Sequence, residues 1–422
     1  MSMKKSINIS VALLLSNSII AYATNGDNLV GVGTKSRGMG GAGIGVSHCA
    51  ESTLQNPALI TCTRGTSISF GGTVFMPDIE AQMGQAQYHS SDADINIIPS
   101  VAISHKFNEN WFVGIGMWGT AGMGVDYRDA SQSQIDSGNM HMVSNLQLMQ
   151  FGTSLAYRTN NFGVAITPLI QYGALDINYQ SFDGSNVGDG VSQDLGFGVN
   201  LGAYYDLTNG LTLGAVYKSK IDMEYKNQLS KATQPFVDFG IFPETMDDHL
   251  EQPAEIGVGI GYEIGKHTLA FDYKQIKWSD AKGYKDFGWD DQNVYSIGYQ
   301  LKEDKFRFRL GYNYASHPIQ EAPSGPAVIS AGDYAQAGGN ALNLFNLLGF
   351  PATAQRHYTI GGGYEFTDNF YIDFAYIYAP ETTTTMDTII GVNPENGDMY
   401  IGESTVKHSE SSLSFQLSYR FF

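Results

Sequence analysis

The sequence predicts an all-β protein: a 14-stranded antiparallel transmembrane β-barrel whose lumen is plugged by the residues that precede the first strand. Two observations carry this prediction. From Thr66 to the C-terminus, apolar and polar residues alternate with a period of two in fourteen segments, and single-chain bacterial barrels have an even number of strands. The connections between the segments are short and long in turn, as in barrels with short periplasmic turns and long extracellular loops.

Residues 1–23 are predicted to be a secretory signal peptide. Lys4 and Lys5 precede an apolar run from Ile7 to Ile20, and Ala21-Tyr22-Ala23 has the small-x-small pattern of a cleavage site. The run is shorter than the ~20 apolar residues of a membrane-spanning helix. We therefore expect cleavage after about Ala23, with a short amphipathic N-terminus as the alternative.

Residues 24–65 follow, and they show no period-two alternation. They are rich in Gly, Ser and Thr. The segment could extend into the periplasm or fold back into the barrel. A ring of this size leaves a lumen that wall side chains alone do not fill, which favours a plug. We therefore divide the chain into a signal peptide (1–23), a lumenal hatch (24–65) and a transmembrane barrel (66–422).

Within the hatch, the segment Gly38-Met39-Gly40-Gly41-Ala42-Gly43 has the G-x-G-x-x-G spacing of dinucleotide-binding proteins. That motif needs a strand before it and a helix after it in a βαβ unit. Here a predicted cleavage site precedes it and a barrel follows it. We therefore expect no cofactor, and interpret the glycines as residues that let the backbone pack closely inside the lumen.

The chain has two cysteines, Cys49 and Cys62, and both lie in the hatch. A disulfide closing this short loop is plausible in an oxidising periplasm. The segment His48-Cys49-Ala50-Glu51 beside Cys62 could suggest a metal site, but it lacks the second His or paired C-x-x-C that such sites use. We expect no bound metal.

The predicted strands are 66–76, 95–107, 111–120, 145–158, 162–182, 191–207, 210–224, 253–265, 266–280, 292–301, 305–315, 355–367, 370–380 and 406–422. The facing of each strand follows from the cost of placing a charge in lipid. An Arg or Lys on the lipid face at the midplane costs about 2–4 kcal/mol. In the segment 306–312, Phe306 and Phe308 are therefore expected to face lipid, and Arg307 and Arg309 the lumen.

The same argument turns Lys218 and Lys274 toward the lumen. Two interpretations of these inward cations remain open. Arg307, Arg309, Lys218 and Lys274 could pair with lumenal carboxylates and brace the barrel wall, or one or more of them could hold the carboxylate of a ligand.

Composition excludes two classes of function. The formal net charge is −18, and nucleic-acid binding depends on basic patches that neutralise phosphates. The nine histidines are scattered, and no G-x-S-x-G motif stands near one, so a hydrolase of the Ser/His/Asp type is not predicted. We expect neither a nucleic-acid partner nor an enzyme.

Several motifs resemble one family of outer-membrane proteins. The glycine-rich stretch 31–45, followed by Asn56-Pro57-Ala58-Leu59-Ile60, is similar to the hatch of the FadL/TodX transporters of long-chain fatty acids and other hydrophobic compounds. Residues 252–259, 289–299 and 358–369 also resemble members of that family, so the likeness covers essentially the whole predicted mature chain. Asn56, Pro57 and Ala58 are its most specific element.

The resemblance implies that a hydrophobic ligand crosses the barrel and leaves sideways, where the third strand is kinked. Here that strand is Trp111 to Gly119. Glycines inside a strand mark bends or broken pairing, so Gly114, Gly116 and Gly119 are candidates for this opening. The alternative is that they only relieve crowding in the wall.

One departure concerns the loops. The family's long third extracellular loop is short here, at 183–190, whereas the sixth, 316–354, is long and carries an apolar stretch at 341–350. That stretch could dock a ligand or cap the barrel. We expect a monomer in the outer membrane of a Gram-negative bacterium, surrounded by outer-membrane lipids and lipopolysaccharide. The alternatives to fatty-acid transport are an aromatic or hydrocarbon channel and a surface adhesin or receptor.

Overall fold

The computed structural model describes residues 24–128, 140–207 and 209–421. The predicted signal peptide and its cleavage site lie outside the described residues. The strands of the barrel wall are β3 (Thr66–Met83), β5 (Asn96–Lys106), β6 (Trp111–Asp126), β7 (Val143–Arg158), β8 (Phe162–Gln180), β10 (Ser192–Leu207), β11 (Leu211–Lys218), β12 (Glu255–Ile264), β13 (His267–Ile276), β14 (Gln292–Glu303), β15 (Phe306–Ala315), β17 (Arg356–Thr367), β18 (Phe370–Val392) and β19 (Met399–Phe421).

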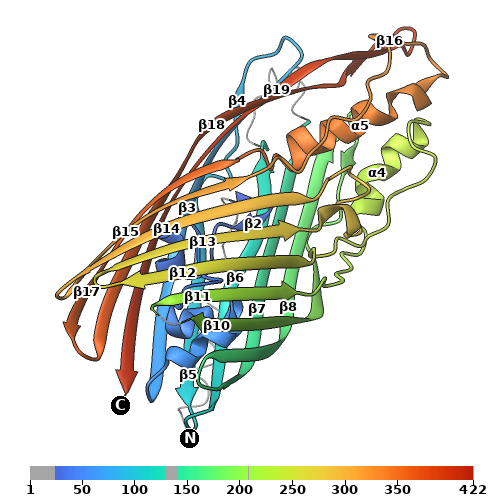
Figure 1. Ribbon diagram of the computed structural model, residues 1–422. Coiled ribbons are helices and arrows are strands. Elements are labelled where there is room, and N and C mark those ends of the chain that lie inside the picture. The colour runs from blue at the N-terminus through green and yellow to red at the C-terminus, as the bar shows by residue number, and fades with distance from the viewer. Residues whose placement is uncertain (1–23, 129–139, 208, 422) are drawn as a thin grey trace, which may run out of the picture.

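These strands form one antiparallel ring in chain order (Figure 1). The ring closes because β19 pairs with β3, from Ser404↔Met83 to Phe421↔Thr66. The predicted 14-stranded barrel is therefore confirmed, and each predicted strand corresponds to one strand of the wall.

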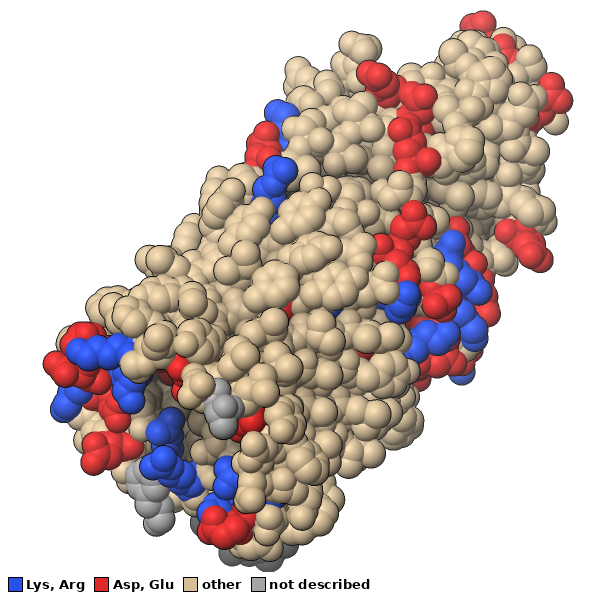
Figure 2. Space-filling view, in the orientation of Figure 1, with Lys and Arg blue, Asp and Glu red and all other residues tan. Residues whose placement is uncertain are grey.

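The alternation of side chains is that of a membrane barrel, apolar outside and polar inside. On β19, Leu413 and Phe415 are 51% and 50% exposed, whereas Ser412, Ser414 and Gln416 are buried. Figure 2 shows the same property on one face of the molecule: Lys, Arg, Asp and Glu gather toward the two ends, and the band between them is largely free of charge. A soluble sandwich would bury the apolar face instead.

The largest differences from the predicted strand ends are in β3, β6, β11 and the β18–β19 hairpin. β3 continues to Met83, although its predicted end was at residue 76. β6 continues to Asp126, and β18 and β19 extend as a hairpin to Val392 and from Met399, because their ladder pairing does not stop at the membrane surface. β11 ends at Lys218, not near 224. Beyond that residue the chain leaves the ladder and keeps only isolated bridges, of which one joins Ile221 to Gln252.

The N-terminal segment, residues 24–65, contains five short elements. They are β1 (Thr24–Asn25), β2 (Asn28–Leu29), α2 (Thr34–Arg37) and two 3-10 helices, η1 (Cys49–Leu54) and η2 (Pro57–Cys62). They contact the lumenal side of the wall: η2 lies against β7, β8 and β10, η1 against β5, and α2 against β18. The segment therefore occupies the interior of the barrel.

The outer end of the barrel carries two helices. α4 (Leu229–Asp238) comes from the 225–252 loop, and α5 (Gly338–Leu344) continues as a π-helical turn, η5 (Phe345–Gly349), in the sixth loop. They lie side by side (Figure 1), with the rings of Phe236 and Phe345 5.1 Å apart. The predicted apolar stretch 341–350 thus lies over the barrel end. No helix of the described residues is long and apolar enough to cross a membrane.

The remaining short elements belong to loops: β4 (His89–Ser90), β9 (Asn186–Val187), β16 (Val328–Ile329), η3 (Trp278–Asp280) and η4 (Tyr334–Ala337).

Candidate functional site

The glycine run of the N-terminal segment surrounds a carboxylate of the wall. Asp272 on β13 accepts hydrogen bonds from the backbone N–H groups of Gly43 at 2.7 Å, Ile44 at 2.8 Å and Gly45 at 3.4 Å. Successive backbone N–H groups that converge in this way form an anion-binding nest. The G-x-G-x-x-G spacing therefore ends in an anion site whose occupant is a side chain of the same protein.

The segment also passes very close to the wall, because glycines face it from several strands. A Cβ added at Gly311 would lie 2.1 Å from the backbone nitrogen of Gly40, and one at Gly214 would lie 1.9 Å from the carbonyl oxygen of Ile44. Gly40 itself has a φ of 67°, which disfavours other residues. Side chains at these positions would hold the segment away from the wall.

Asn56, Pro57 and Ala58 begin helix η2 and attach it to the wall. The Asn56 side chain accepts a hydrogen bond from the N–H of Ala58 at 3.2 Å, and Pro57 occupies the first turn, where no N–H is needed. The Asn56 amide also donates to the carbonyls of Ile44 at 2.8 Å and Ala203 at 3.2 Å. One side chain thus joins the helix, the glycine run and β10.

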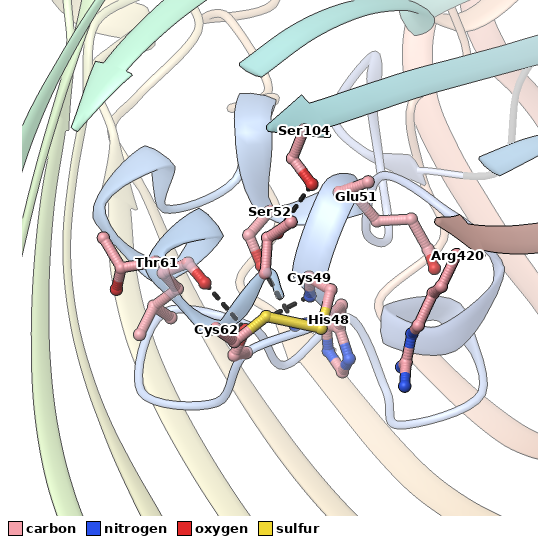
Figure 3. The surroundings of a disulfide bond; sticks show 12 residues. His48, Cys49, Glu51, Ser52, Thr61, Cys62, Ser104 and Arg420 are labelled. Atoms are coloured by element: carbon pink, nitrogen blue, oxygen red, sulfur yellow. Dashed lines mark hydrogen bonds between the residues drawn. A yellow bond between two sulfur atoms is a disulfide. The ribbon is translucent and has the colours of Figure 1, made fainter. Parts of the chain in front are cut away.

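Cys49 and Cys62 form a disulfide between the start of η1 and the end of η2 (Figure 3). From the same helix, Glu51 forms an ion pair with Lys35 at 2.7 Å and accepts a hydrogen bond from Gln416 of β19 at 2.7 Å. Burial lowers the pKa of the neighbouring His48 to about 4, so its ring is neutral at neutral pH. These contacts join η1 and η2 to each other, to Lys35 of α2 and to strand β19.

Strand β6, the third strand of the wall, leaves the regular ladder at Thr120. Its last partner on β5 is Ser100, opposite Trp118. On the other side its register with β7 shifts between Gly119 and Ala121, so Thr120 is the extra residue of a β-bulge. Residues 121–126 are then all buried rather than alternating. This part of β6 therefore turns inward.

We call the place where residues 121–126 of β6 have no partner on β5 the seam. The turn of the β1–β2 hairpin fills part of it, because Asn28 pairs with Ala121 and the N–H of Gly122 donates to the carbonyl of Asp27 at 3.0 Å. The N-terminal hairpin thus replaces β5 as the neighbour of β6 at this point.

The three glycines that the sequence suggested for an opening lie in two different settings. Gly114 and Gly116 remain within the regular ladder. A Cβ at Gly114 would lie 2.8 Å from Thr53 of the N-terminal segment, and one at Gly116 would lie 1.5 Å from the Trp118 ring. Gly119 borders the bulge. Only Gly119 is therefore at the point where the pairing breaks.

Apolar side chains fill the part of the barrel interior that lies between the N-terminal segment and helix α5. We call this group of side chains the outer cluster. It joins the seam, through Met123 and Val125, to the sixth loop, through Leu344, Phe345 and Leu348. Its methionines are Met83, Met123, Met140, Met142, Met223, Met386 and Met399. Methionine is flexible and fills irregular spaces, so the side chains of this interior can adjust to the shape of a ligand.

A small cavity of about 50 Å³ lies between the N-terminal segment and the wall, and we call it the central cavity. It reaches from Thr120 of the bulge to Lys218 and Lys274. Both lysines approach the Glu255 carboxylate, at 3.3 and 3.4 Å. Two cations therefore share one anion beside the seam.

The central cavity has a mixed lining, in which apolar side chains such as Leu29 and Ile44 lie beside amides, hydroxyls and charges. Buried lining atoms without a hydrogen-bond partner in the described structure are Asn25 Oδ1, Gln55 Oε1, Thr120 Oγ1, Asn200 Nδ2, Gln252 Oε1 and Asn313 Oδ1. Buried polar groups are normally satisfied, so these atoms indicate space for water or for a polar group of a ligand.

Arg307 and Arg309 lie elsewhere, in a second cavity of about 400 Å³ toward the short turns. Arg307 pairs with Glu365 at 2.9 Å, and Arg309 with Asp373 at 2.8 Å. The structure therefore separates the four predicted cations into two pairs. Each has a carboxylate partner, the arrangement that the bracing interpretation described.

Three other residues near the seam have no distinguishing sequence pattern; one of them, Tyr284, donates a hydrogen bond to the Asp27 carboxylate. Thr120 is one threonine within an alternating strand, Asp27 is an isolated carboxylate in the N-terminal segment, and Tyr284 is one of 25 tyrosines. Their importance comes from where the strands place them.

Residues 17–334 match the model of the family described as outer membrane protein transport protein (OMPP1/FadL/TodX). Among curated proteins, the long-chain fatty acid transport protein of Escherichia coli O6:H1 is 23% identical over 373 residues, covering 75% of this chain and 82% of that protein.

Two solved structures have a similar fold. A Pseudomonas aeruginosa FadL homologue superimposes with a TM-score of 0.71 at 15% identity, over 94% of this chain and 100% of that one. The Pseudomonas putida toluene transporter TodX gives a TM-score of 0.65 at 17% identity, again over 94% and 100%.

Proposed function

This chain belongs to the outer membrane protein transport family (OMPP1/FadL/TodX), whose members carry hydrophobic compounds, and we propose that it passes long-chain fatty acids or similar molecules inward through a lateral exit at the seam. The residues of the N-terminal segment act, in this proposal, as the hatch that closes the direct route. The ligand enters the outer cluster beneath α5, moves to the inward-turned part of β6 and leaves beside the bulge.

The observation that carries this proposal is the break in pairing at Thr120. From Phe112 to Trp118, β6 pairs with β5 on one side and with β7 on the other, but beyond Trp118 it has no partner on β5. Unpaired strand edges are costly within a membrane, so they occur only where other groups satisfy them. Here the short N-terminal hairpin supplies those groups, through Asn28 and Asp27. A wall that is closed at this point by a two-residue strand, and not by a full-length neighbour, is suited to opening sideways.

The chemistry of the interior supports the same route. A sixteen-carbon chain gains about 0.8 kcal/mol per buried methylene, on the order of 12 kcal/mol in total. The outer cluster offers such burial, whereas the central cavity below it is small, and its lining mixes apolar side chains with amides, hydroxyls and charges. An alkyl chain that continued straight down would meet this narrower, partly polar space and lose part of the stabilisation. A sideways exit into lipid keeps it.

Of the four predicted cations, we propose Lys218 and Lys274 as the groups that hold a ligand carboxylate. They line the cavity that reaches Thr120, while Arg307 and Arg309 lie in the other cavity. A neutral aromatic compound has no anionic group with which either lysine could form an ion pair. The pair therefore favours an acidic amphiphile over the aromatic alternative.

The test is uptake of labelled oleate, with labelled toluene in parallel, by cells that lack the gene and by the same cells complemented with it. We expect oleate uptake to fall on deletion and to return on complementation. Unchanged oleate uptake would contradict the proposal. A return of toluene uptake alone would assign the aromatic alternative, and no change for either compound would favour a surface receptor or adhesin.

A further inference from the structure

Asp27 contacts two parts of the molecule that the transport route must connect. Its backbone carbonyl accepts the hydrogen bond from Gly122 of β6 at 3.0 Å. Its carboxylate accepts a hydrogen bond from the hydroxyl of Tyr284, in the 281–291 loop. Because Asp27 lies in the turn between β1 and β2, it links the hairpin that fills the seam to an extracellular loop.

The hairpin turn is seated on an aromatic cluster that contains Tyr284. The ring centroids of Trp278, Tyr284 and Trp289 lie 4.6 to 5.1 Å apart, and all three side chains are buried. Gly26 lies directly against the Trp278 ring, where an added Cβ would come within 2.5 Å of Cζ2. A shift of this cluster therefore acts on the hairpin directly.

The cluster in turn contacts the helix that covers the barrel. The indole nitrogen of Trp289 donates to the Asn346 side chain of η5 at 2.9 Å, and Asn346 donates to the carbonyl of Phe287 at 2.8 Å. A continuous series of contacts thus runs from Asn346 through Trp289, Tyr284 and Asp27 to Gly122. It begins where a ligand would enter and ends at the seam.

The Asp27 carboxyl is held by few groups for one so deeply buried. It is 0% exposed, and its Oδ1 has no hydrogen-bond partner in the described structure. Burial raises its pKa to about 7. A buried charge with a single good hydrogen bond is costly, so the loss of the Tyr284 contact would leave the hairpin turn unstable where it is.

We infer that Tyr284 and Asp27 are positioning residues of the seam: their hydrogen bond holds the N-terminal hairpin against β6, and a ligand that displaces Asn346 and Trp289 releases it. The inference rests on the proposed lateral transport. It adds the residues that connect ligand entry to exit.

The hairpin position is measurable through a cysteine at Ala121, which is buried opposite Asn28. The native cysteines are joined to each other, so Ala121→Cys provides one reactive thiol in the purified full-length protein. We expect Tyr284→Phe to raise the rate of maleimide labelling about tenfold without ligand, as for loss of a hydrogen bond to a buried carboxylate. Equal labelling rates would overturn the inference.

The matched control is Tyr273→Phe. It removes a tyrosine hydroxyl that donates to Asn293 at 2.8 Å between β13 and β14, away from Asp27, and it should leave labelling unchanged. If Tyr273→Phe accelerates labelling as much as Tyr284→Phe, the effect is general loosening and the inference fails. Heat-dependent mobility on gels verifies that each variant is a folded barrel.

Two further measurements test the direction of the coupling. Asn346→Ala should accelerate labelling although Asn346 does not touch the hairpin, and the effect of Tyr284→Phe should shrink in an Asp27→Ala background, as a double-mutant cycle requires. An unchanged effect of Tyr284→Phe in that background would show that it acts by another route.

The labelling assay needs no substrate, so it separates this inference from the transport proposal. If cells take up no oleate but Tyr284→Phe still frees the hairpin, the contact stands and the proposed substrate fails. If oleate is taken up but the labelling rate is the same with and without the Tyr284 hydroxyl, the transport proposal stands and the inference fails.

Discussion

The carboxylate of Asp272 on β13 accepts a 2.7 Å hydrogen bond from the backbone N–H of Gly43, and the next two N–H groups point to the same carboxylate. This contact attaches the glycine run of the N-terminal segment to the wall at one charged point. It also explains why a spacing that suits a phosphate appears in a chain for which no nucleotide is predicted: the same backbone geometry binds a carboxylate.

Asp272→Asn should loosen the N-terminal segment. Hydrogen bonds to charged groups contribute about 1.5–3 kcal/mol and neutral ones about 1 kcal/mol, so the loss of charge should weaken this contact by about 1–2 kcal/mol. Single-channel conductance in planar bilayers should rise, with more frequent openings to small ions. Asp206→Asn, at an exposed carboxylate, is the control. A conductance equal to that of the parent protein would show that Asp272 does not hold the segment.

Gly259→Ala should displace the same segment by steric means. The added Cβ would lie 2.2 Å from Asp272 Oδ1 and 2.6 Å from the nitrogen of Gly45, and overpacking of this kind costs about 1–3 kcal/mol. The thermal transition of the purified protein should shift downward. Gly391→Ala, where nothing lies within 4 Å of the added carbon, should not shift it. Equal shifts in the two variants would contradict the close packing described here.

Deletion of Thr120 should abolish lateral transport while keeping the barrel. Gly119 pairs with Met149 and Ala121 with Leu148, so removal of the extra residue restores a regular ladder without changing the register on either side. We expect oleate uptake to fall at least about tenfold, the equivalent of about 1.4 kcal/mol. Deletion of Asn396, in the exposed turn between β18 and β19, controls for shortening the chain. Normal uptake by the Thr120 deletion would exclude the seam as the exit.

Lys218→Gln and Lys274→Gln, tested singly, should weaken uptake of oleate but not of a neutral analogue such as methyl oleate. Each removes one cation next to Glu255 while the other remains to pair with it. Loss of one charge-assisted contact is worth about 1.5–3 kcal/mol, so the half-saturating oleate concentration should rise about tenfold or more. Lys220→Gln, at a lysine that pairs with Glu251, is the control. Equal losses for oleate and its ester would rule out a role in carboxylate recognition.

Docking of the hairpin should weaken as pH rises toward about 7. Burial raises the pKa of Asp27 from 3.8 to about 7, and Glu255 adds to the rise while the Tyr284 hydroxyl opposes it; Tyr225 is the other titratable group nearby. The docked state therefore binds a proton more tightly than the free hairpin, so its stability is full below about pH 4 and declines between there and about pH 7.

The measurement is the labelling rate of Ala121→Cys between pH 5.5 and pH 8, divided by the rate in an Asp27→Asn background to remove the titration of the thiol itself. The ratio should increase from pH 5.5 to about pH 7 and level off above it. A constant ratio would mean that the Asp27 carboxyl does not titrate as the hairpin docks.

The barrel was predictable because its main determinant is local. Side chains of a strand point alternately to two faces, and lipid accepts only apolar groups on one of them, so the sequence from Phe306 to Arg309 already indicates which face is which. Turn and loop lengths then indicate the two ends of the barrel. Strand ends were less predictable, as at β18 and β19, because pairing can continue beyond the membrane wherever two segments still match.

The sequence by itself therefore determined the ring of fourteen strands, the facing of its charges and the segment available to occupy the lumen. Only the tertiary structure decided that pairing breaks at Thr120, that Lys218 and Lys274 share Glu255, and that Tyr284 meets Asp27 across 257 residues of chain. Ring closure brings these groups together, and such contacts depend on the positions of many strands at once. The alternation of residues within one strand therefore gives no information about these contacts.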